Sequence, residues 1–542
     1  MSGHDRTKRS STVAGATADR FVAAITVAAV LTLGQGCRTS EDDVHRWANT
    51  AQGPRKLVAV LTHDKYPIDL RIDAAETLVS MKPRGGRRIG IQGTDEQEGL
   101  VDALAQMAPA ARSTLISKLV PKLQAEMAKP PPVAQPGQPT PPDPSIPYKD
   151  AAFAILTHDD GALIPDDGLK KSVRASLAQW CTTNFSERMD DSSQLYGVEQ
   201  VLRVLKAEGV RAIPDMMLPG ANKMDRMADL VAELGDPETK LRASQKLVDV
   251  AKDVSSDNWV KQRRAGVEAA NKQSKLNPTE DQLKLQLAQY QEEELLRVFG
   301  SMKKIGGKPV VDYLLNYVQN KNGIEKRRTA AMAALQGNLD RNNTAQAQVV
   351  LNIAGDPGTP DSLRDVALQR VGEFPRTMVV EKLYELFKND NWKVRWVAAS
   401  LVLKMSDASQ VPEFMTRLGQ ADGLAITEPL SYGGLLSDLK GPPRPADLAD
   451  RYSASGNSVA ARLTALSYYY SAGTPADLPK VEAFEKDSTA TPKCKPDAKE
   501  CEWKCTVQGA SGDEVKEIKT VGEFVEFCVK PAMQKRAKGA SK

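Results

Sequence analysis

The feature that most constrains this chain is a recurring pattern led by arginine. After Arg395, small or apolar residues stand three, four and seven positions on, at Ala398, Ala399 and Val402. Offsets of three, four and seven lie on one face of an α-helix. The same pattern follows five more arginines, which are Arg71, Arg174, Arg328, Arg364 and Arg462. The steps between the last of these arginines fit a repeat of about 34 residues, which predicts stacked helical units.

Each unit also contains an earlier helix. Before Arg395, an apolar stripe includes Val379, Leu383 and Phe387, and the polar residues 389–391 form a turn. One helix pair cannot bury its apolar stripe alone, whereas stacked neighbours share a continuous core. We therefore expect an all-α solenoid of antiparallel helix pairs.

A helix, a short polar turn and a second helix that opens with Val-Arg and carries paired alanines resemble the HEAT repeat. Over residues 41–485 the chain resembles HEAT-bearing bacterial lipoproteins. The resemblance implies an interaction platform, in which the repeated arginine pairs with an Asp of a neighbouring unit. Asp64, Asp236 and Asp390 are candidates for these partners. The segment around Arg242 departs from the pattern, because its +3 and +4 positions are polar.

The composition agrees with a helical fold, and the net charge bears on whether the chain binds nucleic acid. Only 5% of the residues are aromatic and 41% are hydrophobic, which disfavours an all-β sandwich. The formal net charge is +4, from 73 Lys and Arg against 69 Asp and Glu. A balance this close does not predict nucleic-acid binding, so we expect no nucleic-acid partner.

The N-terminal residues indicate an export signal. A basic segment that includes Arg6, Lys8 and Arg9 precedes an uncharged apolar run at residues 21–33. A helix needs about 20 residues to cross a bilayer, so this run is too short to span one. A basic segment followed by a short apolar run is typical of a secretory signal.

The segment that ends at Cys37 resembles the lipidation motif of bacterial lipoproteins, with Gly34, Gln35 and Gly36 before the cysteine. The resemblance implies that residues 1–36 are removed and that Cys37 carries a lipid anchor to the membrane. Arg38 follows where an Asp would mark retention in the inner membrane. We therefore expect an outer-membrane protein of the cell envelope, periplasmic or surface-exposed. An ordinary signal peptide with an incidental cysteine is the alternative.

Breaks in the repeat divide the remaining chain. We predict HEAT-like repeats at 37–129 and 148–485, separated by residues 130–147, in which prolines are dense. This composition favours a disordered insertion, either a linker or a ligand for an aromatic groove. Residues 256–302, interrupted at Asn277-Pro278, are predicted to form a polar helical hairpin with one apolar edge.

Four cysteines lie close together near the C-terminus, at Cys494, Cys501, Cys505 and Cys528. In an exported chain such a cluster predicts two disulfides, here in a C-terminal cap at 486–533. Zinc is the rival, but its usual short ligand pairs are not present on both sides. Cys501 and Cys505 would lie about 13 Å apart along one strand, too far for a mutual disulfide. Two pairings remain, and local closure favours Cys494–Cys501 with Cys505–Cys528.

The cap is predicted to be a ββα module. Alternating residues at 501–507 indicate a strand, and residues 514–519 can return as a second strand. A helix should begin at Thr520 and end at Pro531. The basic residues 534–542 are predicted to form a disordered tail.

No catalytic motif is present in the sequence. The histidines after the leader, His45, His63 and His158, lack the spacing of metal ligands. We therefore predict no catalytic, cofactor-binding or metal-binding residues. Cys181 stands at the +7 position after Arg174, which indicates a buried core thiol rather than a nucleophile.

Two classes of function remain open. The first is a non-catalytic, membrane-anchored scaffold that binds another protein along the solenoid surface. The alternative is an envelope enzyme, or an accessory factor similar to the HEAT-type bilin lyases. Convergent acids, histidines or a deep pocket would favour the alternative.

Overall fold

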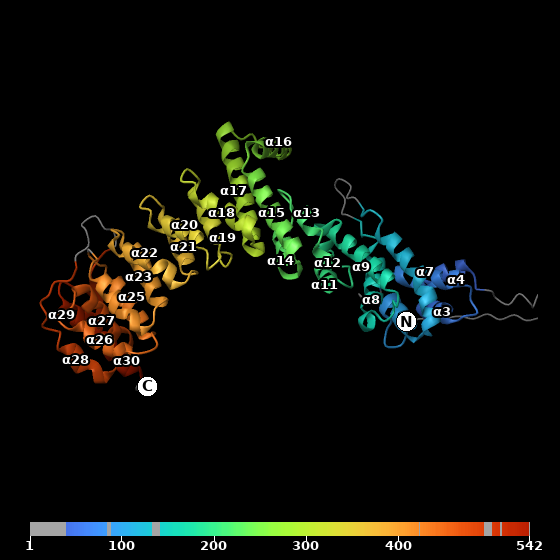
Figure 1. Cartoon of the computed structure of the whole chain (residues 1–542). Coiled ribbons are helices and arrows are strands. Elements are labelled where there is room, and N and C mark those ends of the chain that lie inside the picture. The colour runs from blue at the N-terminus through green and yellow to red at the C-terminus, as the bar shows by residue number, and fades with distance from the viewer. Residues whose placement is uncertain are drawn as a thin grey trace, which may run out of the picture. The chain divides into compact units, whose positions relative to one another are not determined.

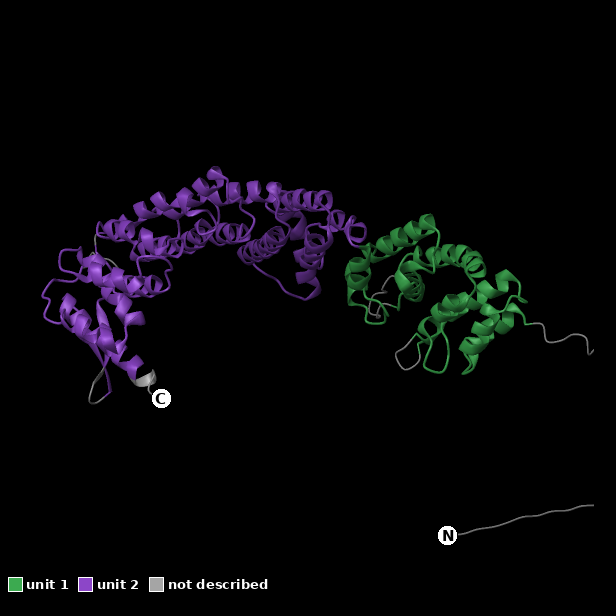
Figure 2. Ribbon diagram, turned by 60° about the horizontal axis from the view of Figure 1, so that its bottom comes forward, with its two compact units in different colours: residues 1–205 green, residues 206–542 purple. Residues whose placement is uncertain are grey.

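The computed structural model describes residues 39–83, 88–132, 141–421, 423–492, 501–509 and 512–540. The predicted signal peptide (1–36), Cys37, Cys494 and residues 133–140 of the proline-rich insertion lie outside these ranges. The chain divides into two compact units, Met1–Leu205 and Lys206–Lys542, which Figure 2 shows in different colours.

The regular elements of unit 1 are all helices over its described residues. Its elements are α2 (Glu41–Trp47), α3 (Gly53–Thr62), α4 (Ile68–Ser80), α5 (Ile89–Gln92), α6 (Leu100–Gln106), α7 (Pro109–Met127), α8 (Ile146–Thr157), η1 (His158–Gly161), α9 (Asp167–Thr182), α10 (Phe185–Asp190) and α11 (Val198–Leu205). Helix α8 is the centre of the unit, because it packs against both α7 and α9 and is buried on nearly all sides. Ile146 and Pro147, predicted to end the insertion, already belong to α8, since proline fits the first turn of a helix.

Unit 2 begins with a longer series of helices. They are α12 (Ala207–Val210), α13 (Ile213–Met216), α14 (Met224–Leu234), α15 (Pro237–Val254), α16 (Asp257–Gln273), α17 (Glu280–Ile305), α18 (Lys308–Gln319), α19 (Glu325–Ala334), α20 (Thr344–Gly355), α21 (Asp361–Val371), α22 (Arg376–Glu385), η2 (Leu386–Lys388), α23 (Trp392–Lys404), η3 (Ala408–Gln410), α24 (Val411–Leu418), α25 (Thr427–Ser437), α26 (Pro445–Ser453), α27 (Val459–Ala472), η4 (Pro475–Asp477) and α28 (Leu478–Glu482).

Consecutive helices of unit 2 pack as pairs, and the pairs stack. Helix α18 packs on α19, α20 on α21, α22 on α23 and α26 on α27. The second helices also form a row, in which α19, α21, α23, α25 and α27 each contact the next (Figure 1). Each apolar stripe is therefore covered by the neighbouring pair, and the predicted all-α repeat architecture is confirmed.

The stripes that follow the six arginines form the core of this repeat. The residues at +3, +4 and +7 are buried after each of the six arginines, except Ala178, which is half-buried. Cys181 is a free thiol with no exposed surface, as predicted. The arginines themselves are also buried, apart from the half-buried Arg174. A helical period in the sequence was therefore sufficient to identify this part of the core.

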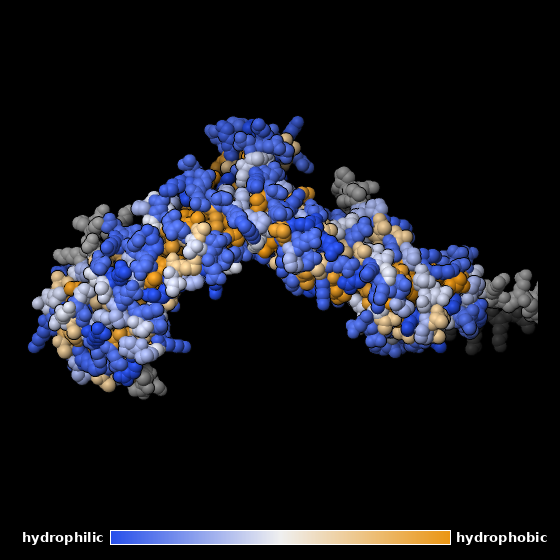
Figure 3. Space-filling model, in the orientation of Figure 1, coloured by the Kyte–Doolittle hydropathy of each residue, from blue (hydrophilic) through white to orange (hydrophobic). Residues whose placement is uncertain are grey.

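The predicted polar hairpin is formed by α16 and α17. A small cluster of Val267, Leu283 and Leu287 holds the two helices together, with Val260 and Tyr290 packed against it. The hairpin leaves the row of helix pairs as an arm, and Figure 3 shows the end of that arm as hydrophilic. The apolar edge of the hairpin is thus packed between its own two helices.

The C-terminal cap is a ββα module, as predicted. Strand β1 (Lys504–Gly509) pairs antiparallel with β2 (Gly512–Glu517). Helix α29 (Val521–Phe524) follows from an N-cap at Thr520, and a disulfide joins Cys505 to Cys528. Cys501 is also disulfide-bonded.

Two predictions for the end of the chain are wrong. The helix does not end at Pro531, because it continues through a π-helical turn (η5, Val525–Val529) into α30 (Lys530–Ala540). Proline donates no N–H, and the wider π turn before it relieves the clash that a regular helix would impose. The predicted tail at 534–542 is therefore helical to Ala540. Arg536 stabilises this helix by donating to the main-chain oxygens of Tyr469 (2.6 Å) and Gly473 (3.2 Å) at the end of α27.

None of the helices in the described ranges combines the length and the apolar character that crossing a bilayer requires.

Candidate functional site

The repeated arginines stabilise the ends of the helices that precede them. Arg71 donates from Nε to the main-chain oxygen of Leu61 (2.8 Å), the penultimate residue of α3. Arg328 donates to the oxygen of Val318 from Nε (3.0 Å) and Nη2 (2.8 Å). The last carbonyl groups of a helix have no partner within the helix, so a buried guanidinium supplies the missing donor.

The same function recurs in the later repeats. Arg364 donates to the main-chain oxygen of Thr359 (2.7 Å), and Arg395 to that of Asn389 (2.6 Å), both in the turn within a helix pair. Arg462 donates from Nε to the oxygen of Ser453 (3.1 Å), the last residue of α26. Five of the six arginines therefore close the turn of their own helix pair.

The last three of these arginines meet carboxylates, but not the Asp side chains that the resemblance implied. Arg364 pairs with Asp361 (2.6 Å), Arg395 with the buried Glu428 (3.1 Å), and Arg462 with Asp487. Burial raises the pKa of Glu428, while Arg395 and the N–H of Ala425 oppose that shift.

The three predicted Asp positions have other contacts. Asp64 lies beside His63, 3.3 Å away. Asp236 caps α15 by accepting from the N–H of Thr239 (2.7 Å), a bond that also lowers its pKa. Asp390 accepts from Arg395 through its main-chain oxygen (3.2 Å). A helix cap and a turn explain these residues, because a short carboxylate can bond to the backbone beside it.

A groove of about 670 Å³ crosses three successive helix pairs of unit 2. Gln319 and Lys321 line it at the end of α18, and Asn352 lies on its α20 side. Leu386 and Lys388 line it beyond α22. The groove is open to solvent and bounded by the turns that the repeated arginines hold in place.

The charged residues of the groove are unequally paired. Lys321 binds Asp356 at 2.6 Å, which lowers the pKa of that carboxyl, and Lys382 binds Glu385. The remaining cations of the lining are Lys388, which has no polar partner among the described residues, and the buried Arg328. The groove therefore presents more positive than negative charge.

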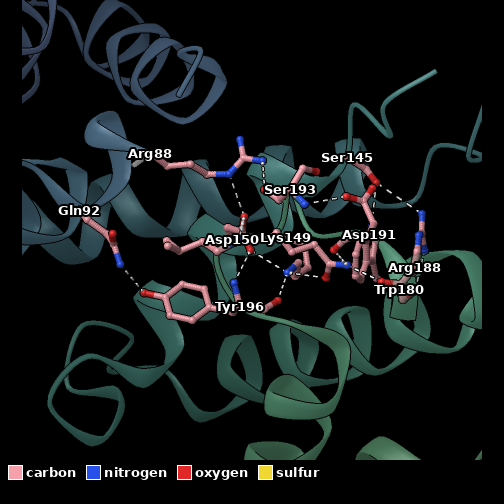
Figure 4. A network of polar contacts seen from close by, with 12 residues as sticks. Arg88, Gln92, Ser145, Lys149, Asp150, Trp180, Arg188, Asp191, Ser193 and Tyr196 are labelled. Atoms are coloured by element: carbon pink, nitrogen blue, oxygen red, sulfur yellow. Dashed lines mark hydrogen bonds and ion pairs between the residues drawn. The ribbon is translucent and has the colours of Figure 1, made fainter. Parts of the chain in front are cut away.

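Unit 1 contains a different kind of polar site, a buried network centred on α8 (Figure 4). Lys149 and Asp150 both have 0% exposure, and the ammonium lies 2.6 Å from the carboxylate. Arg88 pairs with the other carboxylate oxygen at 3.0 Å. The N–H groups of Leu195 and Tyr196 also donate to this carboxylate, at 3.0 and 3.2 Å.

Further bonds complete the surroundings of Lys149. Its ammonium donates to Gln194 (3.1 Å) and to the main-chain oxygen of Tyr196. Burial lowers the pKa of Lys149, while Asp150 opposes that shift. The ammonium also lies 5.0 Å from the ring centre of Trp180, a cation–π contact.

A second arginine extends the network towards the base of the proline-rich insertion. Arg188 pairs with Asp143 at 2.9 Å, stacks on Trp180 at 4.1 Å and donates to that residue's main-chain oxygen (2.5 Å). Ser145 accepts from the indole N–H of Trp180 at 2.7 Å. Burial raises the pKa of the neighbouring Cys181 thiol to about 12, so it is held in its neutral form.

This network joins segments that lie far apart in the sequence. It ties residue 88, α8 and the 191–196 loop into one buried cluster with most of its donors and acceptors satisfied. The sequence analysis missed it, although Lys149-Asp150 directly before a buried apolar run in one helix was a usable signal. Such a buried cluster, with most of its members hydrogen-bonded, stabilises a fold.

The structure describes only some of the cysteines that were predicted to be modified or disulfide-bonded. Cys505 and Cys528 are joined as predicted, whereas Cys37 and the predicted partner of Cys501, Cys494, lie outside the described residues. Over the described ranges, no three His, Cys, Asp or Glu side chains are grouped so as to hold a metal ion.

Comparison with known proteins supports the repeat. No curated protein matched the chain. The family model described as the vitellogenin TPR domain matches residues 201–401, from α11 to α23. Over this part, which contains the arm, the groove and three of the six arginines, the chain is similar to the TPR domain of vitellogenins, a helical-repeat domain.

Proposed function

We propose that this protein is a non-catalytic, membrane-anchored scaffold of the bacterial cell envelope, built from HEAT-type helix pairs, that binds another protein along unit 2. The groove across α18, α20 and α22 carries this proposal. Stacked repeats present long, continuous surfaces, and function on such a fold depends on the site rather than on the fold itself.

The chemistry of the groove suits a polypeptide. Its apolar side includes Val349 and Leu386, which can receive side chains, and the amides of Asn352 and Asn389 can bond to an extended backbone. The groove is open to solvent, whereas small-molecule pockets usually enclose most of the ligand. A protein segment is therefore the ligand that this surface supports best.

The binding proposal is tested by site-specific crosslinking in whole cells. A photo-reactive amino acid replaces Asn352 in the groove, and the matched control replaces Gln369, an exposed amide on α21 outside it. We expect a discrete adduct at position 352 and none at 369. Equal labelling at both positions, or none at either, contradicts a scaffold that binds through this groove.

The tether is a separate part of the proposal and rests on the motif that ends at Cys37. Without a modifiable thiol no acyl chain can be attached, so Cys37→Ser should move the protein from the membrane fraction to the soluble fraction. Cys181→Ser is the control for loss of a thiol. A wild-type protein that is already soluble, or a Cys37→Ser protein that stays in the membrane, contradicts the anchor.

A further inference from the structure

We propose that the groove of unit 2 binds an acidic segment of the partner protein, whose carboxylate completes the coordination of Arg328. This inference rests on the proposed function and deepens it, because it names the chemistry of the ligand. The observation that supports it is a difference among the equivalent arginines of unit 2.

Arg328 differs from the three equivalent arginines that follow it. Each of those meets a carboxylate, supplied by Asp361, Glu428 or Asp487. Arg328 is only 5% exposed, and its contacts are two hydrogen bonds to the one oxygen of Val318. A buried guanidinium that meets a single carbonyl leaves most of its charge uncompensated, which is costly in a protein interior.

The nearby carboxylates are engaged elsewhere. Glu325, one turn before Arg328, accepts from the hydroxyl of Ser362 at 2.5 Å. Asp356 is held by Lys321, and Asp361 by Arg364. The partner that Arg328 lacks is therefore not supplied by these side chains.

Arg328 lines the groove, so the missing carboxylate can come from outside. Its Nη1 makes no hydrogen bond with the described residues and is not among their buried, unpartnered atoms. A guanidinium binds carboxylates through short, charge-assisted hydrogen bonds. Nη1 is thus the donor that a carboxylate in the groove would meet.

Lys388 supplies a second cation in the same groove. It is exposed, has no partner among the described residues and lies beyond α22, two helix pairs on from α18. A single carboxylate would use only part of such a surface. A segment with more than one acidic residue can meet both Arg328 and Lys388, with its backbone along Asn352 and its apolar side chains against Leu386.

The test measures binding of a fluorescent peptide of alternating glycine and glutamate to the full chain, with the glycine–glutamine peptide as its neutral counterpart. We expect the acidic peptide to bind at least about ten-fold more tightly than the neutral one. Lys388→Glu should weaken acidic-peptide binding by roughly ten-fold and reduce its dependence on salt. Lys261→Glu, the same change at an exposed, unpaired lysine of α16, should leave binding unchanged.

A second variant addresses Arg328 itself. Arg328→Lys keeps the charge, but an ammonium cannot reach both Val318 and a ligand in the geometry of a guanidinium, so acidic-peptide binding should weaken several-fold. Its melting temperature is measured in parallel. If this variant does not fold, Lys388→Glu alone decides the question.

Three results would overturn the proposal. The peptides could bind equally, Lys388→Glu could have no more effect than Lys261→Glu, or inorganic phosphate could displace the acidic peptide while free glutamate binds as tightly as the peptide. The last result would indicate a site for small anions. Crosslinks at position 352 that persist in Lys388→Glu would leave the scaffold intact and refute only the acidic ligand, whereas their absence in the wild type refutes the scaffold.

Discussion

Units 1 and 2 both bury charged side chains, but for different structural purposes. In unit 2 a buried guanidinium such as Arg328 serves the turn only ten residues before it. In unit 1 the carboxylate of Asp150 binds Arg88 and the backbone of Leu195, more than forty residues away on either side. Unit 2 is therefore stabilised by one local device repeated many times, and unit 1 by a single long-range cluster. A substitution that disrupts the unit 1 cluster should consequently destabilise more of the surrounding helices than a substitution in one repeat of unit 2.

The largest expected effect is that of Asp150→Ala. The substitution leaves Lys149 and Arg88 buried without their carboxylate, which should destabilise unit 1 by about 5 kcal/mol. Hydrogen exchange followed by mass spectrometry should show loss of protection across α7, α8 and α9, with unit 2 unchanged. Asp64→Ala, at a carboxylate whose side chain is 95% exposed, is the control. An effect confined to α8 would show that unit 1 is no more cooperative than a repeat.

The cap of unit 2 is held by a contact between residues far apart in the sequence, as the cluster of unit 1 is. It therefore tests whether damage to such a contact also spreads in unit 2. Cys528→Ser removes the bond to Cys505 and should destabilise the cap by about 3 kcal/mol. Limited proteolysis should then cut the helices from α25 to α30, because α27 loses its cover, while unit 1 resists as before. Cys181→Ser should produce no such cleavage. Mass mapping of the unreduced wild type should yield the Cys505–Cys528 peptide, and a free thiol at either position would contradict this prediction.

The repeated arginines should behave alike in both units. Arg71→Ala and Arg328→Ala each remove charged donors to one helix-end carbonyl, so each should cost about 2 kcal/mol of stability. Urea unfolding followed by region-resolved hydrogen exchange measures the two effects separately. Arg55→Ala, at an exposed residue of α3, should stay within about 0.5 kcal/mol. A much larger effect at Arg71 would mean that unit 1 uses its arginine as part of the long-range cluster.

The smallest expected effect concerns the thiol of Cys181, beside the unit 1 network. Burial raises its pKa from 9.0 to about 12, so the folded chain binds this proton more tightly than the unfolded chain does. Its contribution to stability is therefore complete below pH 9 and declines as the pH rises towards 12. Iodoacetamide at pH 8 should label Cys181 only after unfolding, and Cys181→Ala should show a shallower decline in stability above pH 9 than the wild type. Rapid labelling of the native chain would show that the cluster opens readily.

Sequence periodicity was enough to predict the repeat but not the contacts of its arginines. The +3, +4 and +7 stripe after Arg395 identifies one buried helix face, because helical geometry relates residues within a single turn or two. It cannot show whether Arg395 meets Asp390 or Glu428, since that depends on how the next pair packs. The structure places the carboxylate of Glu428 against the guanidinium, whereas Asp390 accepts from it through its main-chain oxygen, as Asn389 does.

The same limit explains the outcome at the C-terminus. Spacing in the sequence was sufficient to exclude a Cys501–Cys505 bond and to favour Cys505–Cys528, which the structure contains. Pro531 was predicted to end the helix, because local rules disfavour proline there. The π turn before it and the bonds from Arg536 to α27 keep the helix intact, and neither is visible in a local window.

By itself, the sequence determined the helical class, the repeated arginine stripe and the polar hairpin, because each depends on spacing along a short stretch of chain. It favoured the Cys505–Cys528 bond but left a second pairing open, and the structure decided between them. Only the tertiary structure decided which carboxylate each arginine meets, how Asp150 gathers Arg88 and the 191–196 loop, and why Arg328 is left with one carbonyl in an open groove. Such contacts arise when separate helices pack, and their energies depend on burial and charge that no local pattern encodes.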